Sequence, residues 1–262
     1  MKKRTIFLIA LVIFFPLNNL PSYATGTSSE DAVAGISSPY LFTPDNVEGN
    51  ASGNSVSHFL DGFSSISADA MKYALTGYAA LNEAGKILQK DIITIVDFSK
   101  PSTQERLFVI NLRTKSVIAK SLCAHGRNSG EIFAEKFSNN AESYQSSLGF
   151  YIANETYDGK HGYSLRLDGE EAGINDNARD RGVVVHGADY VSKSFINNTG
   201  RLGRSQGCPA LPMDMYQKII SLIKGGSCFF IYHPNNYYRT HSLILKHYNE
   251  SCLAEVVSGL TE

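Results

Sequence analysis

The stretch 201-RLGRSQGCPALP-212 places a cysteine in a glycine-containing turn, where thiol chemistry is possible. Cys208 can be a buried structural thiol, half of a disulfide, a metal ligand or a nucleophile. Nucleophilic catalysis requires a thiolate, a base that forms it, and N–H donors for the oxyanion of an acyl intermediate. The question is whether the rest of the chain supplies these groups.

A histidine at the end of an apolar run is the candidate base. The run 182-GVVVH-186 has the β-branched pattern of a short strand, and Gly187 follows it. Strand ends are where a rigid scaffold presents side chains to a cleft. In the cysteine turn, the N–H groups of Gln206, Gly207 and Cys208 are expected to point at one oxygen. Gly207 lets a substrate approach the backbone closely.

Residue spacing and net charge argue against a metal site, a cofactor and nucleic-acid binding. His161, His186, Asp189 and Cys208 lack the tight spacing of a zinc site, so we expect no metal and no cofactor. The formal net charge is −1, which leaves no basic surplus for nucleic acid.

The N-terminus has the pattern of a secretory signal peptide over residues 1–24. A cationic start precedes the apolar run 5-TIFLIALVIFF-15 and the small residues of 22-SYA-24. We therefore expect export to the periplasm and no membrane insertion after cleavage; an uncleaved anchor is the alternative. Export permits disulfides, and Cys228 with Cys252 is the pairing we favour if one forms.

Four segments follow from composition and periodicity. They are the signal peptide (1–24), a flexible leader (25–63), one catalytic domain (64–238) and a C-terminal tail (239–262) that helices would suit. A helix is expected from Ser67, as N-cap, to Gly85, and another over 213–224. Strands are expected at 91–98, 106–112, 116–124, 148–153, 163–167, 182–186 and 228–233. This predicts a mainly β fold with a few helices, arranged as a sandwich or a barrel-like sheet.

The chain resembles the YkuD-like L,D-transpeptidases over roughly Ser64 to Pro234. Their mark is a histidine, a variable gap and Ser/Thr-His-Gly-Cys, and here 185-VHGA-188 and 205-SQGC-208 match it. The stretches 94-TIVDFSKPS-102, 144-YQSSLGFY-151, 159-GKHGYSLRL-167 and 175-NDNARDR-181 look like the murein L,D-transpeptidase branch. The resemblance implies a β-sandwich with an N-terminal helix before the sheet.

The resemblance also implies a mechanism. Cys208 would attack a peptidoglycan stem peptide next to a terminal D-residue, and an amine acceptor on another stem would resolve the thioester. His186 would shuttle protons, oriented by the Gly187 carbonyl or by Asp189. Ser205 is expected to shape the turn rather than to react, and we expect a monomer.

Two positions depart from the family motif. Gln206 stands where the family has histidine, and Ala210 stands where a polar residue often follows the cysteine. Arg201 and Arg204 are therefore the nearby candidates for a peptide carboxylate, because a guanidinium grips it in a bidentate way.

Other polar clusters have two interpretations each. Lys160 and His161 line the cleft or form a solvated turn. Asn175, Arg179 and Arg181 bind substrate or belong to a surface salt-bridge network. His125 is expected to be structural.

Two alternative functions stay open. An L,D-carboxypeptidase differs only in using water to resolve the thioester. A non-catalytic peptidoglycan-binding module would keep the cleft without turnover, and the change to Gln206 is the feature that favours it.

Overall fold

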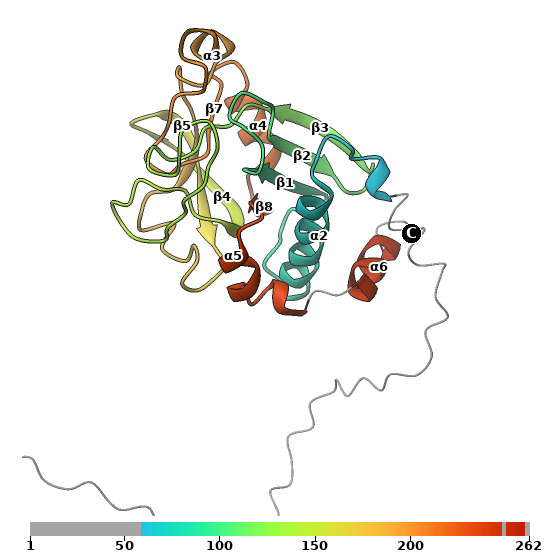
Figure 1. Ribbon diagram of the computed structural model, residues 1–262. Coiled ribbons are helices and arrows are strands. Elements are labelled where there is room, and N and C mark those ends of the chain that lie inside the picture. The colour runs from blue at the N-terminus through green and yellow to red at the C-terminus, as the bar shows by residue number, and fades with distance from the viewer. Residues whose placement is uncertain (1–58, 248–249, 260–262) are drawn as a thin grey trace, which may run out of the picture. The chain divides into compact units, whose positions relative to one another are not determined.

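An eight-stranded sheet dominates the part of the chain that the structure describes (Figure 1). The computed structural model describes residues 59–247 and 250–259. The strands are β1 (Ile92–Asp97), β2 (Leu107–Asn111), β3 (Ser116–Ser121), β4 (Gly149–Gly159), β5 (Gly162–Gly169), β6 (Val184–Gly187), β7 (Ala210–Leu211) and β8 (Ser227–Tyr232). The predicted signal peptide and most of the predicted leader lie outside the described residues.

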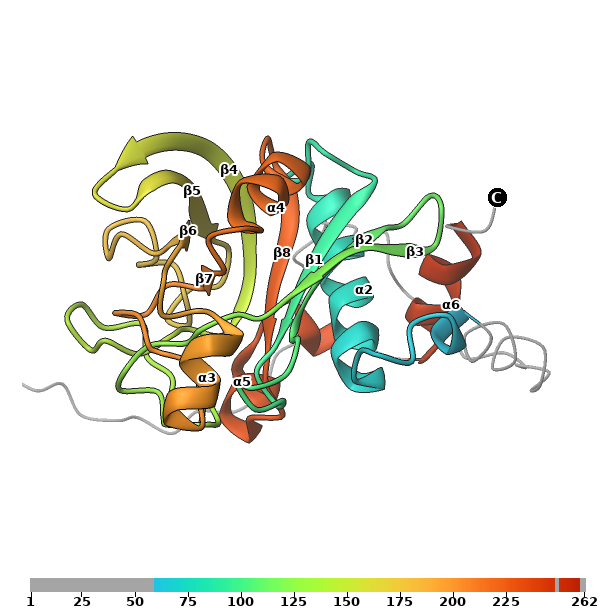
Figure 2. The same cartoon turned by 90° about the horizontal axis from the view of Figure 1, so that it is seen from above.

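The strands are hydrogen-bonded in the order β3-β2-β1-β8-β4-β5-β6-β7. Strand β1 runs parallel to β8, and β6 runs parallel to β7, whereas the other neighbours are antiparallel. Figure 2 shows the long strand β4 bending away from the central strands together with β5. The mainly β fold with a helix before the sheet is confirmed.

Helices cover both faces of the central strands. They are α2 (Ala68–Glu83), α3 (Lys193–Thr199), α4 (Tyr216–Ile223), α5 (Asn236–His241), the 3₁₀ turn η1 (Leu245–His247) and α6 (Glu250–Gly259). Figures 1 and 2 show α2 and α4 on opposite sides of β1 and β8. Every residue of these two strands is buried, as expected for strands that are covered on both faces.

The fold begins earlier than the predicted boundary after residue 63. Phe59 and Phe63, which the sequence assigned to the leader, are buried in the core. Ser67 occupies the N-cap position of α2, as predicted, but its hydroxyl does not cap the helix. It donates instead to the carboxylate of Asp97, which ties the start of α2 to the end of β1.

The predicted tail is largely helical where it is described. Leu245, Leu253 and Val257 are buried and belong to the main core. Figure 1 shows α6 beside α2, and the two helices are in contact. The tail is therefore part of the domain's packing.

Cys123, Cys208 and Cys228 are free thiols. The pairing of Cys228 with Cys252 is therefore wrong, and so is the interpretation of Cys208 as half of a disulfide. Cys123 and Cys228 are fully buried. Burial raises the pKa of Cys123 to about 12, so this thiol is an inert core group.

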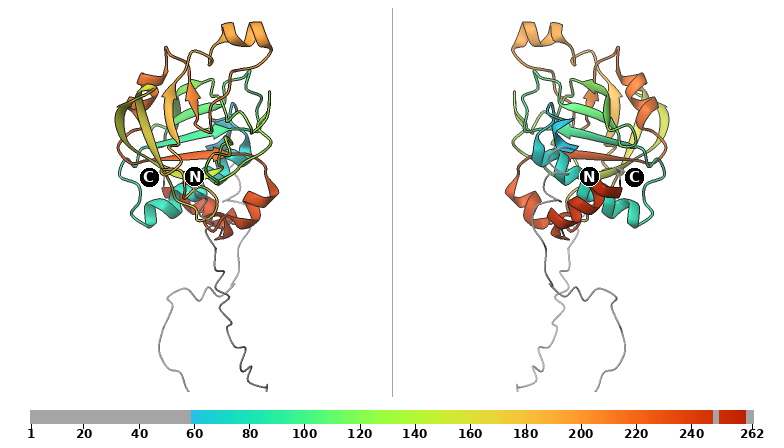
Figure 3. Two further views of the ribbon diagram at one scale, coloured as in Figure 1. Left: turned by 90° about the vertical axis from the view of Figure 1, so that its left-hand side faces the viewer. Right: turned by 90° about the vertical axis from the view of Figure 1, so that its right-hand side faces the viewer.

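Helix α3 stands away from the sheet, as both views of Figure 3 show, and none of its residues is buried. It is held locally: the Ser192 hydroxyl accepts from the Phe195 N–H, and Gly200 closes the helix in the left-handed conformation. No helix in the described part of the chain is long and apolar enough to cross a membrane.

Candidate active site

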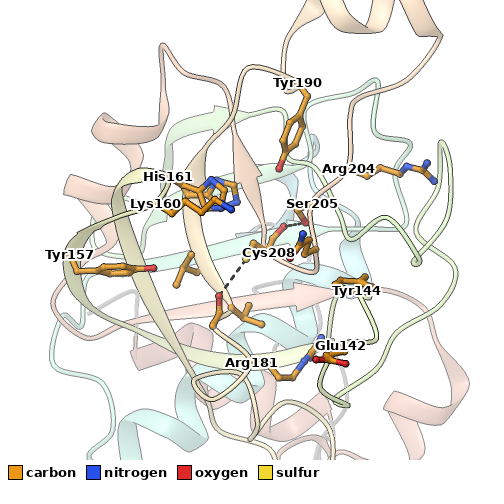
Figure 4. Close-up of a pocket in the computed structure, with 15 residues that line it drawn as sticks. Glu142, Tyr144, Tyr157, Lys160, His161, Arg181, Tyr190, Arg204, Ser205 and Cys208 are labelled. Atoms are coloured by element: carbon orange, nitrogen blue, oxygen red, sulfur yellow. Dashed lines mark hydrogen bonds between the residues drawn. The ribbon is translucent and has the colours of Figure 1, made fainter.

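Cys208 and His186 line one cleft of about 550 Å³. The parallel pair β6–β7 explains why they meet, because His186 lies opposite Ala210, two residues after the cysteine. Figure 4 shows Cys208 at the centre of this cleft. Ala210 is buried in β7, so at this departure from the family motif the side chain faces no substrate.

The turn before β7 is held by the hydroxyl of Ser205. Its Oγ accepts from the Gly207 N–H at 3.1 Å and donates to the Cys208 carbonyl at 2.6 Å. The prediction that the Gly207 N–H is one of three oxyanion donors is therefore wrong, because this group already donates to the Ser205 hydroxyl. The N–H groups of Gln206 and Cys208 have no hydrogen-bond partner among the described residues, which leaves both for an oxyanion.

Gly207 is required by its conformation. Its φ is +129°, and a Cβ there would lie 2.8 Å from the carbonyl oxygen of Gln145. We expect Gly207→Ala to lower the free energy of unfolding by roughly 2 kcal/mol and to displace the thiol, abolishing acylation. Gly173→Ala is the matched control, because its φ is +74° with no atom within 4 Å of the added methyl. Thermal unfolding of both variants checks this; equal losses would contradict the clash with Gln145.

His186 is buried and held in one tautomer. Its Nδ1 donates to the Gly187 carbonyl at 2.9 Å, because a carbonyl can only accept, and this leaves Nε2 as an acceptor. Asp189, the second candidate for this role, is not the partner. The ring stacks on His161 with the centroids 4.5 Å apart and the planes inclined by 25°. Gly187 lets the backbone pass the ring of Tyr216, since a Cβ would lie 2.7 Å from it.

The thiol and the imidazole are both neutral at neutral pH. Burial raises the pKa of Cys208 above its ordinary value, although the Val184 N–H and the charge of Arg181 oppose this. The sulfur lies 3.6 Å from the Gly182 carbonyl, which suits a protonated thiol. Burial and the charge of His161 lower the pKa of His186. A neutral pair fits general-base catalysis, in which the imidazole removes the thiol proton during attack.

The cleft is lined, together with the thiol, by the predicted polar residues Lys160, His161, Arg204, Ser205 and Gln206. Lys160 and His161 form the turn between β4 and β5, and Figure 4 shows them on the opposite side of Cys208 from Arg204. Arg204 is not a free cation, because its Nη1 lies 2.6 Å from the carboxylate of Glu131.

The structure does not bring Arg201 or Asn175 into this cleft. Arg201 pairs with Glu131 at 2.8 Å, so both arginines of the cysteine turn share one carboxylate. Asn175 is fully buried, and its Nδ2 donates to the carbonyls of Leu148 and Phe150 at 2.9 and 3.0 Å. These contacts make Asn175 a structural amide.

Arg179 also lies outside the cleft. It forms ion pairs with Glu155 and Asp168 at 2.8 and 2.5 Å on the surface. The surface salt-bridge alternative describes this residue. Arg181, two residues later, does line the cleft. The three residues that were predicted as one cluster therefore have different roles, because each side chain has different partners.

Sequence reasoning missed four residues of the cleft wall, namely Glu142, Tyr144, Tyr157 and Tyr190. They come from three separate segments, and no local spacing relates them to the cysteine. Glu142 and Tyr144 have φ values of +56° and +54°, which are rare for residues with a side chain. Such conformations cluster at functional sites, but the sequence does not reveal these two.

His125 is a structural residue. It is buried, its Nδ1 accepts from the Nη2 of Arg106 at 2.7 Å, and its Nε2 donates to the Gly130 carbonyl at 3.2 Å. Burial and the Arg106 charge lower the pKa of His125 to about 3, so it stays neutral. Among the described residues, no group of three or more His, Cys, Asp or Glu side chains is arranged to hold a metal ion.

Comparison with known proteins completes the description of the site. The family model of the L,D-transpeptidase catalytic domain matches residues 63–232. None of the curated proteins matches the chain.

Solved structures of L,D-transpeptidases are also similar to parts of the chain. One from Mycobacterium smegmatis is 13% identical with a TM-score of 0.34, and the match covers 55% of this chain and 59% of that one. L,D-transpeptidase 3 from Mycobacterium tuberculosis, in complex with a faropenem-derived adduct, is 12% identical with a TM-score of 0.35, covering 55% and 60%. One from Enterococcus faecium is 11% identical with a TM-score of 0.33, covering 54% and 50%.

The chain thus spans less than two thirds of each of these proteins. The family match, in contrast, covers well over half of this chain and includes both His186 and Cys208. The chain belongs to the L,D-transpeptidase catalytic domain family.

Proposed function

We infer that the protein is an exported cysteine L,D-transpeptidase that crosslinks peptidoglycan. The Cys208 sulfur attacks the carbonyl between an L-centre and the terminal D-residue of a donor stem peptide. A carbon–sulfur bond forms, the amide bond breaks, and the D-residue leaves as an amine. The amine of an acceptor stem then attacks the thioester, which restores the thiol and leaves a new amide crosslink.

His186 transfers the protons in both half-reactions. Its Nε2 removes the thiol proton as the sulfur attacks and gives a proton to the leaving amine. In the second half it removes a proton from the acceptor amine and returns one to the sulfur. The N–H groups of Gln206 and Cys208 stabilise the oxyanion in each tetrahedral intermediate.

One observation carries this proposal: a neutral histidine with a fixed tautomer lines the same cleft as the free thiol. A module that only bound peptidoglycan would need neither the oriented imidazole nor the unpaired N–H groups. Lys160 and Arg181 give the cleft positive charge, which suits the carboxylates of stem peptides. The proposed location is the periplasm, because the N-terminal pattern is that of a signal peptide.

The test is product analysis with purified protein and tetrapeptide stems. We expect crosslinked dimers and free D-residue in equal amounts, read by mass spectrometry. We also expect a carbapenem to add its full mass to the peptide that contains Cys208, because the β-lactam carbonyl acylates the thiol and the opened ring stays attached. Shortened stems without dimers would identify an L,D-carboxypeptidase. Binding of stems with neither product would leave a non-catalytic module.

A further inference from the structure

Arg181 is fixed by the loop that forms one wall of the cleft. Its Nη1 donates to the Ser138 carbonyl and the Ser147 hydroxyl at 2.8 and 2.5 Å. Its Nη2 donates to the Ser143 hydroxyl and the Gln145 carbonyl at 3.3 and 2.7 Å. One guanidinium thus holds the segment 138–147, which we call the wall loop, at four points.

All four acceptors are neutral, so the positive charge of Arg181 is not compensated. No carboxylate of the described residues lies within ion-pair distance of it, whereas Arg179 pairs with Glu155 and Asp168 and Arg204 pairs with Glu131. Glu142 lines the same cleft but forms no ion pair with Arg181. Burial lowers the pKa of Arg181. A guanidinium nevertheless keeps its proton in proteins at neutral pH, so the group remains charged. A partly buried cation with neutral partners has a strong field, because little solvent screens it.

This charge lies against the turn 205–208 that carries Cys208, which we call the nucleophile turn. A Cβ on Gly207 would be 3.5 Å from the Arg181 Nη2 and 2.8 Å from the Gln145 carbonyl that the same nitrogen binds. The Ser146 hydroxyl donates to the Gly207 carbonyl at 3.1 Å, which joins the wall loop to the turn directly. The Cys208 sulfur contacts the carbonyl of Gly182, the residue that follows Arg181.

The wall loop needs such a fixed support. Glu142 and Tyr144 project into the cleft from left-handed backbone conformations, which are unfavourable for residues with a side chain. Strained conformations persist where the surrounding contacts determine them, and the four Arg181 hydrogen bonds are such contacts.

We propose that Arg181 is the positioning residue of this site: it holds the wall loop against the nucleophile turn and supplies a fixed positive charge that favours the Cys208 thiolate. The inference rests on Cys208 being the nucleophile of the proposed function. The charge acts among other groups of the cleft. Glu142 opposes it, and Lys160, Arg204 and any protonated His161 or His186 act in the same direction. Tyr144, Tyr157 and Tyr190 also line the cleft, and burial raises the pKa of Tyr190 to about 12.

Alkylation of Cys208 by iodoacetamide tests this role without requiring turnover. The rate at pH 8 follows the thiolate fraction and is read from the mass of the Cys208 peptide. We expect Arg181→Gln to react about tenfold more slowly, equivalent to a thiol pKa raised by about one unit, and Arg181→Lys to recover most of the rate. Arg179→Gln removes the same charge from the surface two residues away and should react at the parent rate.

An unchanged rate in Arg181→Gln would overturn the proposal, as would an equal decrease in Arg179→Gln. If Arg181→Gln does not fold, Arg181→Lys decides: a folded lysine variant with a tenfold lower rate refutes the role of the charge, and one near the parent rate supports it. A failure of the proposed function would be seen separately, as the absence of products from stem peptides, because the alkylation rate reports only on the thiol.

Discussion

Replacing Cys208 with alanine is expected to abolish both stem-peptide turnover and carbapenem labelling. In the proposed mechanism the sulfur forms the bond to the acyl group, and no other described side chain in the cleft can replace it at neutral pH. We expect turnover to fall by roughly 10⁴-fold or more. Thermal unfolding should change little, because the Cys208 thiol is only partly buried and its hydrogen bond to the Gly182 carbonyl, at 3.6 Å, is weak.

A second cysteine supplies the matched control for this experiment. Cys228 is fully buried in β8, away from the cleft. Cys228→Ala should lower the free energy of unfolding by about 1 kcal/mol while leaving turnover at the parent level. Turnover that survives in Cys208→Ala, or that disappears in a folded Cys228→Ala, would show that the chemistry lies elsewhere.

Replacing His186 with glutamine has the second largest expected effect. Loss of a general base should reduce kcat/KM by roughly 10³-fold. In the parent, kcat/KM should rise with pH as His186 loses its proton, with a midpoint below the ordinary 6.5 because burial and His161 lower this pKa. The glutamine variant should lack that acidic limb. Its residual rate should rise only at alkaline pH, as the Cys208 thiol, whose pKa is raised, ionises.

His161→Phe separates the two causes of this shift. The phenyl ring preserves stacking on His186 but carries no charge, so the acidic limb should move to higher pH without a comparable loss of the plateau rate. Rate–pH profiles of the three proteins measure this. An acidic limb that remains in His186→Gln would mean that another group is the base.

Most of the fold could be predicted because its strands are apolar and β-branched. Elements without that signal were missed or shortened. Strand β7 has two residues, which is too short for any period, and α3 buries no residue and so has no apolar stripe. The predicted strand 148–153 continues to Gly159 as β4, because its second half is polar and largely uncovered.

The site residues that lie in recognisable local motifs could be predicted from the sequence. The strand-terminal His-Gly and the Gly-Cys turn placed His186 and Cys208 in one cleft. Asn175, Arg179 and Arg181 show the limit, since seven residues contain a buried amide, a surface ion pair and a cation in the cleft. Their roles depend on partners from distant segments, such as Phe150, Asp168 and the wall loop, and spacing along the chain does not contain this information.

The protonated resting state of Cys208 has a consequence for damage by oxidants. In the proposed periplasmic location no glutathione pool would return a sulfenic acid to a thiol, and peroxide attacks thiolates far faster than thiols. Burial keeps Cys208 protonated between turnovers, and the thiols of Cys123 and Cys228 lie out of reach in the core. A catalytic cysteine that ionises only when His186 removes its proton during attack would therefore be oxidised slowly while it waits for substrate.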